Sequence, residues 1–362
     1  MNDTLLRFVL IPFVQIAVVI SIVLFSVMYL VLLERKVNAW MQSRLGPMRV
    51  GWHGALQPVA DVLKLFIKED LTPTHVDRLM FYLAPVILLL PAMAAFAVLP
   101  LSGQPFRVGG VAINPWISDV NVGLLFLLAI SSLGVYGIVM AGWASNSKYS
   151  MLGALRSAAQ MVSYEVPLGL SVVSILMLAG TASMVGIVRA QAEAGYWFVF
   201  WMPYPQIVGL FLYFVSGVAE TNRLPFDLPE AENELVAGFH TEYSGMKFAF
   251  FFLAEYINMI VVGCIVAVLF LGGWLPVTLG IPGLREPLSN VLPFLGDAGA
   301  TLTGFFWLVL KVLVVLFVYL WMRATFPRYR YDQLMKLGWK WLIPLALVHV
   351  MFTGLVMLLS RG

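Results

Sequence analysis

The sequence is poor in charged residues and in cysteine. Only 11% of its 362 residues are charged, against about 25% in a typical soluble domain, and 61% are hydrophobic. So few polar groups cannot cover a water-facing surface, so the apolar excess must face lipid or neighbouring subunits. The single cysteine, Cys264, lies in an apolar run. Alone, it excludes an intrachain disulfide, a cysteine zinc site and a cysteine-ligated iron–sulfur cluster within this chain.

Familiar catalytic motifs are missing as well. The chain has no phosphate-binding loop, dinucleotide fingerprint, nucleophile elbow or pair of histidines at metal-ligand spacing. Its four histidines are scattered and are interpreted as loop or packing residues, so we expect no metal site and no cofactor bound by this chain. The net charge of +3 gives little support to nucleic-acid binding, because membrane topology explains the basic residues better.

Long apolar runs are what the sequence does contain. A membrane-spanning helix needs roughly 20 apolar residues, and such runs occur at about 12–33, 81–101, 121–143, 163–185, 204–220, 247–271, 302–324 and 342–360. The prediction is an all-α integral membrane protein with about eight transmembrane helices in a single polytopic domain over 1–362. The first run is too long for a cleavable signal peptide and has no cleavage pattern, so we expect it to stay as an anchor.

Lysine and arginine are distributed unevenly between the loops. Loops 34–80, 144–162, 221–246 and 325–341, with the adjoining Lys247 and Arg323, hold 16 of the 22 basic residues, whereas the termini and the other loops hold five. The positive-inside rule makes the first set cytoplasmic and predicts that both termini are outside. The outer loops, 102–120, 186–203 and 272–301, are interpreted as simple connections. We expect a multi-pass protein of a bacterial inner membrane with periplasmic termini.

One cytoplasmic segment, 54–69, follows helical spacing without being long enough to cross a bilayer. Its apolar side chains recur at the spacing of one helix face, and Gln57, Asp61, Lys64 and Lys68 lie on the opposite stripe. We therefore predict an amphipathic helix in the membrane interface, either as a plain anchor or with a functional role.

Carboxylates in or near the apolar runs are the best candidates for chemistry. Glu165, Glu220 and Glu255 fall within predicted spans, as does Lys311, and ionised groups at such depth are costly unless paired or hydrated. The predicted acidic cytoplasmic loop, 221–246, adds Asp227, Glu230, Glu232, Glu234 and Glu242, opposed mainly by Arg223 and Lys247. Coupled carboxylates in a wet cleft can relay protons. The alternative is a solvated loop with structural ion pairs, for example Glu255 with Lys311.

Several segments, in one order, resemble a known family. They are 33–36 (LERK), 44–47 (RLGP), 56–69 (LQPVADVLKLFIKE), 142–149 (GWASNSKY), 163–166 (SYEV), 219–223 (AETNR), 225–228 (PFDL), 234–243 (ELVAGFHTEY), 254–256 (AEY) and 327–334 (PRYRYDQL). Together they resemble the H subunits, the quinone-site membrane subunits of the proton-translocating NADH:quinone oxidoreductase, respiratory complex I. Met48 stands where we associate the family with asparagine, which puts only that turn in doubt.

The resemblance implies that this chain is not catalytic alone. FMN and iron–sulfur clusters belong to partner subunits, including peripheral quinone-site, iron–sulfur and antiporter-like membrane subunits, and the quinone is the substrate. Matching positions for a quinone tunnel are Arg35, Asp61, Arg223 and Phe252. Positions that match a carboxylate relay toward the pumping subunits are Glu165, Glu220, Asp227, Glu230, Glu232, Glu234 and Glu255.

Two other functions stay open on the sequence. A homologous membrane subunit of an ion-pumping hydrogenase or formate hydrogenlyase complex would share the layout of spans without needing a quinone. A stand-alone ion transporter could use Glu165, Glu220 and Glu255 as a coupling site, although its interrupted spans and inverted repeats are not evident.

Overall fold

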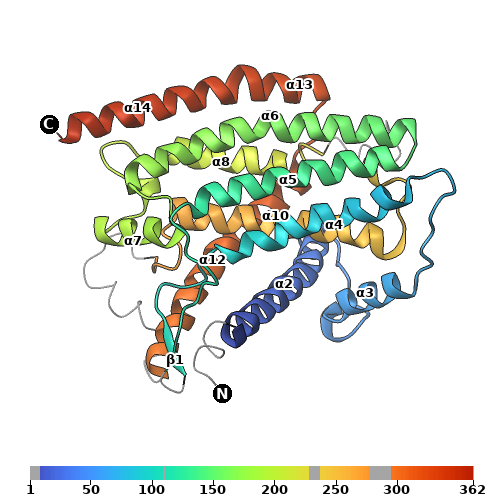
Figure 1. Ribbon diagram of the computed structural model, residues 1–362, viewed down its shortest axis with the longest axis horizontal. Coiled ribbons are helices and arrows are strands. Elements are labelled where there is room, and N and C mark those ends of the chain that lie inside the picture. The colour runs from blue at the N-terminus through green and yellow to red at the C-terminus, as the bar shows by residue number, and fades with distance from the viewer. Residues whose placement is uncertain (1–8, 109–110, 228–236, 278–294, 362) are drawn as a thin grey trace.

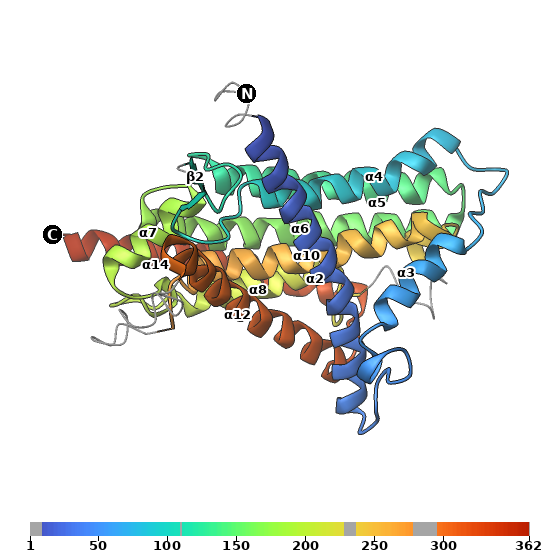
Figure 2. The ribbon, with the colours of Figure 1, turned by 90° about the horizontal axis from the view of Figure 1, so that it is seen from below.

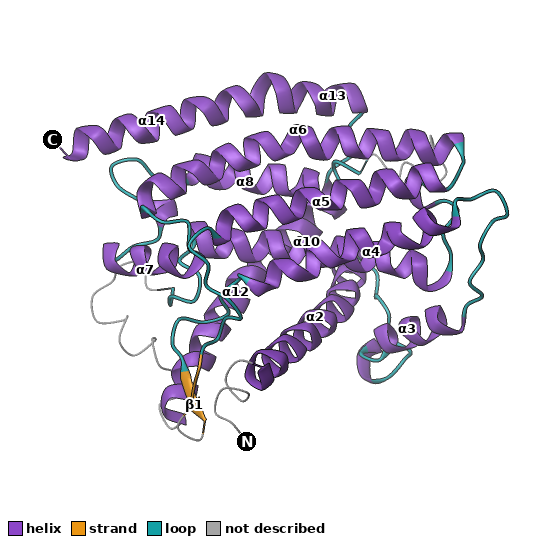
Figure 3. Ribbon diagram, viewed as in Figure 1, coloured by secondary structure: helices purple, strands orange, loops and turns teal. Residues whose placement is uncertain are grey.

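The protein is helical almost throughout in its computed structural model, which describes residues 9–108, 111–227, 237–277 and 295–361 (Figures 1 and 3). The long helices are α2 (Ile11–Met41), α4 (Arg78–Ala94), α5 (Gly123–Ala144), α6 (Lys148–Ala179), α8 (Ile207–Glu220), α10 (Gly245–Phe270), α12 (Gly296–Thr325) and α14 (Ile343–Arg361). Shorter helices are α3 (Gln57–Ile67), α7 (Met184–Ala194) and α13 (Tyr331–Lys336), and a π-helix, Leu337–Leu342, joins α13 to α14.

Single turns and one hairpin complete the described elements. Short 3-10 turns occupy Trp52–Gly54, Ala95–Ala97, Phe198–Phe200 and Gly238–His240, and β1 (Phe106–Val108) pairs antiparallel with β2 (Val111–Ile113). The hairpin lies within the outer loop 102–120.

The expected fold class is confirmed: seven helices in the described part are long and apolar enough to cross a membrane. The remaining predicted span, 204–220, corresponds to α8, which is apolar but has only 14 residues. At 1.5 Å per residue it reaches about 21 Å, less than the roughly 30 Å hydrocarbon core.

Helix α10 forms the centre of the bundle. It packs against α4, α8 and α12, and α6 packs against α5, α8 and α14 (Figures 1 and 2). From Met259 to Phe270 every residue of α10 is buried, which its unbroken apolar sequence allows. Helix α14 lies at the edge and is largely exposed, the expected surface for contact with lipid or another subunit.

Helices α2 and α6 extend far beyond one end of their predicted spans, and both extensions matter. Helix α2 continues eight residues past position 33, so Glu34 and Arg35 lie on a helix instead of in a loop. Helix α6 begins at Lys148, inside the predicted loop 144–162. Its polar first half is stabilised by buried hydrogen bonds: Gln160 donates to the carbonyls of Ala219 (2.7 Å) and Phe226 (2.8 Å). Hydropathy alone misses such a segment because its polar groups are satisfied within the protein.

The outer loop 186–203 is more than the simple connection expected. It contains most of α7, whose N-cap Ser183 accepts a hydrogen bond from the Gly186 amide at 3.0 Å. The helix buries Ile187 and Val188 against the bundle. A short amphipathic helix of this kind is below the length that a search for spans detects.

The amphipathic segment predicted over 54–69 forms α3, with Pro58 in its first turn and an extended Lys68 after its last. Its apolar face is open in the isolated chain: Phe66 is 64% exposed and Ile67 is 84% exposed. Exposed apolar side chains on a helix too short to span a bilayer agree with a position in the membrane interface.

Candidate functional site

A buried carboxylate on α2, Glu34, forms the centre of a charged cluster. It is 5% exposed and accepts hydrogen bonds from the Tyr256 hydroxyl of α10 (2.9 Å), from Arg223 (3.4 Å) and from Arg323 of α12. These partners come from three distant parts of the chain. A carboxylate removed from water needs such counter-charges and donors to stay ionised. We call Glu34, Arg223, Glu255, Tyr256 and Arg323 the charge cluster.

Glu34 was not among the residues selected from the sequence, because it falls just outside the first predicted span. The signal that could have found it is helical spacing: Leu30 lies four residues before and Val37 three residues after, and both are buried. Glu34 therefore occupies an apolar stripe of the helix. A charge on such a stripe is a candidate for a buried pair.

Arg223 connects two carboxylates of different helices. Its guanidinium contacts Glu34 of α2 and forms an ion pair with Glu255 of α10, and it lies 4.2 Å from the centre of the Tyr256 ring. The chain reaches this position through Asn222, whose φ of 51° reverses the backbone after α8. Asparagine tolerates that left-handed conformation better than most residues. A planar guanidinium is suited to two simultaneous carboxylate contacts, which an ammonium is not.

Arg35 and Asp61, both predicted for the quinone tunnel, form an ion pair of 2.5 Å between α2 and α3. Gln57 donates a second hydrogen bond to Asp61 at 3.0 Å. The pair is partly open, with side-chain exposures of 47% and 30%. Arg35 follows Glu34 directly in α2, so this outer pair and the charge cluster are neighbours. Solvent or an amphipathic ligand can reach the outer pair more easily than the cluster.

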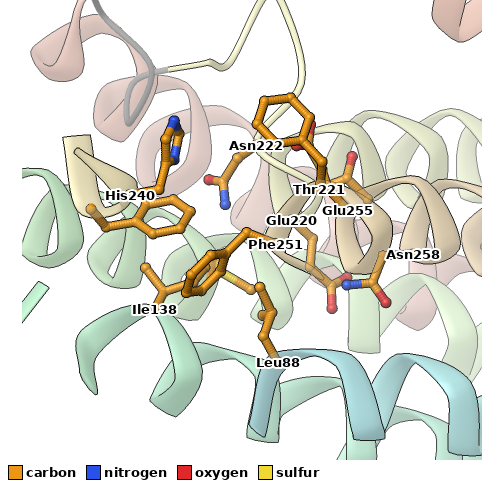
Figure 4. Close-up of a pocket in the computed structure, with 12 residues that line it drawn as sticks. Leu88, Ile138, Glu220, Thr221, Asn222, His240, Phe251, Glu255 and Asn258 are labelled. Atoms are coloured by element: carbon orange, nitrogen blue, oxygen red, sulfur yellow. The ribbon is translucent and has the colours of Figure 1, made fainter. Parts of the chain in front are cut away.

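A cavity lies between α4, α5, α6, α8 and α10 (Figure 4). The volume that the centres of water molecules can occupy in this cavity is about 40 Å³. This is room for about three waters at roughly 10–15 Å³ each. Its lining combines apolar and polar side chains: Leu88, Ile138, Met161, Phe239, Phe251 and Phe252, with Glu220, Thr221, Asn222, His240, Glu255 and Asn258.

Glu220 is the carboxylate that joins this cavity to a second one. The second cavity, of about 30 Å³, extends toward Ser131 and Tyr213, and Glu220, Thr221 and Asn258 line both cavities. In Figure 4 the side chains of Glu220 and Asn258 point toward one another. The carboxylate, hydroxyl and amide in the shared wall of the two cavities offer polar partners to waters that can pass protons.

Glu165 and Glu220, both predicted for the carboxylate relay, lie near one another. Glu165 on α6 is close enough to interact electrostatically with Glu220, which in turn contacts the Ser131 hydroxyl of α5. Of the acidic loop, Asp227 forms an ion pair of 2.8 Å with Arg328. The predicted residues Glu230, Glu232 and Glu234 lie outside the described residues.

Phe252, predicted for the tunnel, is half-buried on α10 and lines the first cavity. Its ring centre lies 4.6 Å from Phe248 and 5.9 Å from His240. Burial lowers the pKa of His240 to about 4, because an imidazolium would lose its hydration there. His240 is therefore neutral at pH 7 and contributes a polar edge to an aromatic wall without adding charge.

The alternative pairing of Glu255 with Lys311 is wrong. Lys311 donates instead to the carbonyls of Gly273 (2.8 Å) and Leu275 (2.6 Å), and its ammonium lies 4.6 Å from the Trp197 ring centre. Those carbonyls follow the far end of α10, about 22 Å along the helix from Glu255. The sequence predicted that both residues lie at a similar depth in the membrane, but it could not predict the directions in which their side chains point.

Comparisons with known proteins point in one direction. The model of a protein family described as NADH dehydrogenase matches residues 14–354. The chain is 47% identical to an NADH-quinone oxidoreductase H subunit (H 2) of Koribacter versatilis, over 98% of each chain. It is 48% identical to an H subunit (H 1) of the same enzyme from Geobacter sulfurreducens, over 96% of this chain and 94% of the relative. It is 47% identical to the H subunit of Cupriavidus necator, over 94% and 91%.

Proposed function

The chain belongs to the NADH dehydrogenase family, and from this premise we propose that it guides a quinone to its reduction site and couples that reduction to proton translocation. In this proposal it works as the H subunit of a proton-translocating NADH:quinone oxidoreductase. The observation that carries the coupling is Arg223, which touches Glu34 on one side and Glu255 on the other. A change of charge at either carboxylate therefore alters the energy of the other.

The quinone route is proposed to run along α2, α3 and α10. The partly exposed Arg35–Asp61 pair lies between α2 and α3, and the aromatic wall with Phe252 belongs to α10. The exposed apolar face of α3 gives the isoprenoid tail of a quinone a lipid-side approach. Charged donors near an apolar passage fit a ligand with a polar head and a greasy tail.

The proton relay is proposed to start at the charge cluster and to continue through the two cavities. Glu255 lines the first cavity, Glu220 lies in the shared wall, and Glu165 is close enough to feel the charge of Glu220. A negative charge that develops on the reduced quinone would weaken the hold of Arg223 on its carboxylates and favour proton uptake. Asp227, Glu230, Glu232 and Glu234 are proposed as further members of this relay.

Topology and partners follow from the same proposal. The excess of basic residues in one set of loops supports a cytoplasmic charge cluster and periplasmic termini in a bacterial inner membrane. FMN and iron–sulfur clusters are assigned to other subunits, since this chain has one cysteine, and it lies buried in a span.

Purification in a mild detergent tests the assignment to this complex. We expect tagged chain to co-purify with flavin, iron–sulfur subunits and NADH oxidation activity, as measured by mass spectrometry of the partners and by absorption spectra. A nickel hydrogenase among the partners would indicate an ion-pumping hydrogenase instead, and a chain that purifies alone would favour a transporter.

Photo-crosslinking with a quinone analogue tests the route. We expect labels on α2, α3 and α10, located by peptide mass spectrometry, and we expect Arg35→Met to reduce labelling. Arg330→Met is the matched control, since the Arg330 side chain is 78% exposed and its ion pair is with the nearby Asp332. Labels that avoid all three helices would contradict the proposed tunnel.

A further inference from the structure

Another buried cation, Lys247, lies on the cytoplasmic side at the start of α10, and the proposed function does not use it. The Lys247 side chain is only 8% exposed and forms an ion pair of 3.0 Å with Asp70. It also donates to the Thr72 hydroxyl at 2.9 Å. From the sequence, Lys247 was expected to oppose the negative charges of the acidic loop 221–246. The contacts with Asp70 and Thr72 are instead with the loop after α3.

Two aromatic rings complete the surroundings of Lys247. Its ammonium lies 4.1 Å from the centre of the Tyr82 ring and 5.1 Å from that of Phe81, both near the start of α4. The Tyr82 hydroxyl is 3.1 Å from Thr72. A cation over aromatic faces that also holds a carboxylate and a hydroxyl is fixed from several directions. Lys247 therefore connects α10, α4 and the loop after α3.

The backbone of that loop is fastened to α10 at neighbouring points. Ser244, the N-cap position of α10, accepts a hydrogen bond from the Leu71 amide at 3.0 Å and donates to the Glu69 carbonyl at 3.4 Å. A Cβ added at Gly245 would lie 3.4 Å from the Lys68 carbonyl, and Gly245 has a φ of +56°. The loop thus packs directly on the first turn of α10, at a position that favours glycine.

These contacts hold the C-terminal end of α3 against the N-terminal end of α10, and both helices line the proposed quinone route. Helix α3 ends at Ile67, one residue before the fastened loop, and Asp61 lies six residues earlier on the same helix. The first turn of α10 packs against this loop, and Phe252 and Glu255 lie further along α10. Since both helices are stiff over this distance, a rotation at the fastened loop moves Asp61 relative to α10.

We propose that Lys247 is a positioning residue for quinone binding: with Asp70, Thr72 and the rings of Phe81 and Tyr82 it holds α3 against α10. The inference rests on the proposed function, because it needs a quinone route between these helices. The described contacts of Lys247 do not include the route's charged pairs. It acts on the ligand only through the distance between α3 and α10, so its effect belongs to binding more than to chemistry.

The test compares Lys247→Met with Lys247→Arg in the assembled complex. We expect Lys247→Met to raise the KM for a long-chain quinone by roughly three- to tenfold with kcat changed less than about twofold, because a displaced wall weakens binding. Lys247→Arg keeps the charge and the ring contacts and should restore the KM. The control is Lys340→Met, because the Lys340 side chain is exposed and forms no ion pair with any described residue.

Each outcome decides the inference. An unchanged KM in Lys247→Met overturns it, and so does a parallel fall in kcat and in the amount of complex without a change of KM, which is the sign of a merely structural role. If Lys247→Met does not assemble, Thr72→Val and Asp70→Asn remove partners from the loop side, and a raised KM in both is required. If the quinone analogue labels α3 and α10 of the wild type but the KM of Lys247→Met is unchanged, the positioning role of Lys247 is wrong and the proposed route stands. If the labels lie elsewhere, the proposed route itself is wrong.

Discussion

Replacing Glu255 with glutamine is expected to lower quinone reduction by the assembled complex by roughly tenfold or more, while electron transfer from NADH to an artificial acceptor stays near normal. The reason is that Glu255 and Glu34 share Arg223. The variant removes one of the two carboxylates that hold Arg223, and its amide cannot take up and release a proton. A rise of about 1.4 kcal/mol in the barrier is enough to slow a reaction tenfold. Both rates are measured on the same purified complex.

Glu220→Gln should have a similar effect for a different reason. Its amide keeps the shape of the shared wall between the two cavities but cannot take up and release a proton. We therefore expect proton pumping into vesicles to fall at least as much as quinone reduction. Glu193→Gln serves as control, since Glu193 is exposed on α7 and lines neither cavity. Normal coupled quinone reduction in both Glu255→Gln and Glu220→Gln would remove the relay from this chain.

Arg223→Met is expected to be the most damaging single change. It leaves Glu34 with Arg323 and Tyr256 and takes from Glu255 the ion pair with Arg223. Both carboxylates are buried or nearly so, and a methionine cannot compensate their charge. We expect loss of most quinone reductase activity and a lower melting temperature of the purified complex. Arg223→Lys should keep part of the activity, because one ammonium cannot serve both carboxylates equally well.

A double-mutant cycle makes this prediction sharper. Arg223→Met already breaks the contact between Arg223 and Glu34, so adding Glu34→Gln cannot break it again. The double variant should therefore be more stable than the sum of the single losses predicts by about 0.5–3 kcal/mol, the range for residues in contact. The melting temperature of the four forms measures the coupling. Strict additivity would show that Arg223 and Glu34 act independently, contrary to the ion pair.

The site was only partly accessible from the sequence. Arg35 and Asp61 were selected for a quinone tunnel through the family resemblance, and the structure shows that they form an ion pair. Glu165, Glu220 and Glu255 were selected because charges within apolar runs are costly, and they lie along the cavities or beside them. Glu34 was missed because the predicted first span ends at position 33, whereas the helix continues to Met41.

Local properties alone determined the class of the protein. Mean hydropathy and the length of apolar runs depend only on neighbouring residues, so the membrane character, the approximate number of spans and the amphipathic segment before Lys68 were all available from the sequence. The bias of basic residues between loops is local in the same way, and it gave a prediction for the cytoplasmic side.

Only the tertiary structure decided which charges face one another. Arg323 reaches Glu34 across 289 positions of sequence, and Arg223 reaches it across 189. Lys311, at a similar depth by sequence, turns to backbone carbonyls instead of to Glu255. The physical reason is that an ion pair depends on the relative rotation of helices far apart in the chain, which packing of the whole bundle sets, whereas the burial cost of each charge is visible one residue at a time.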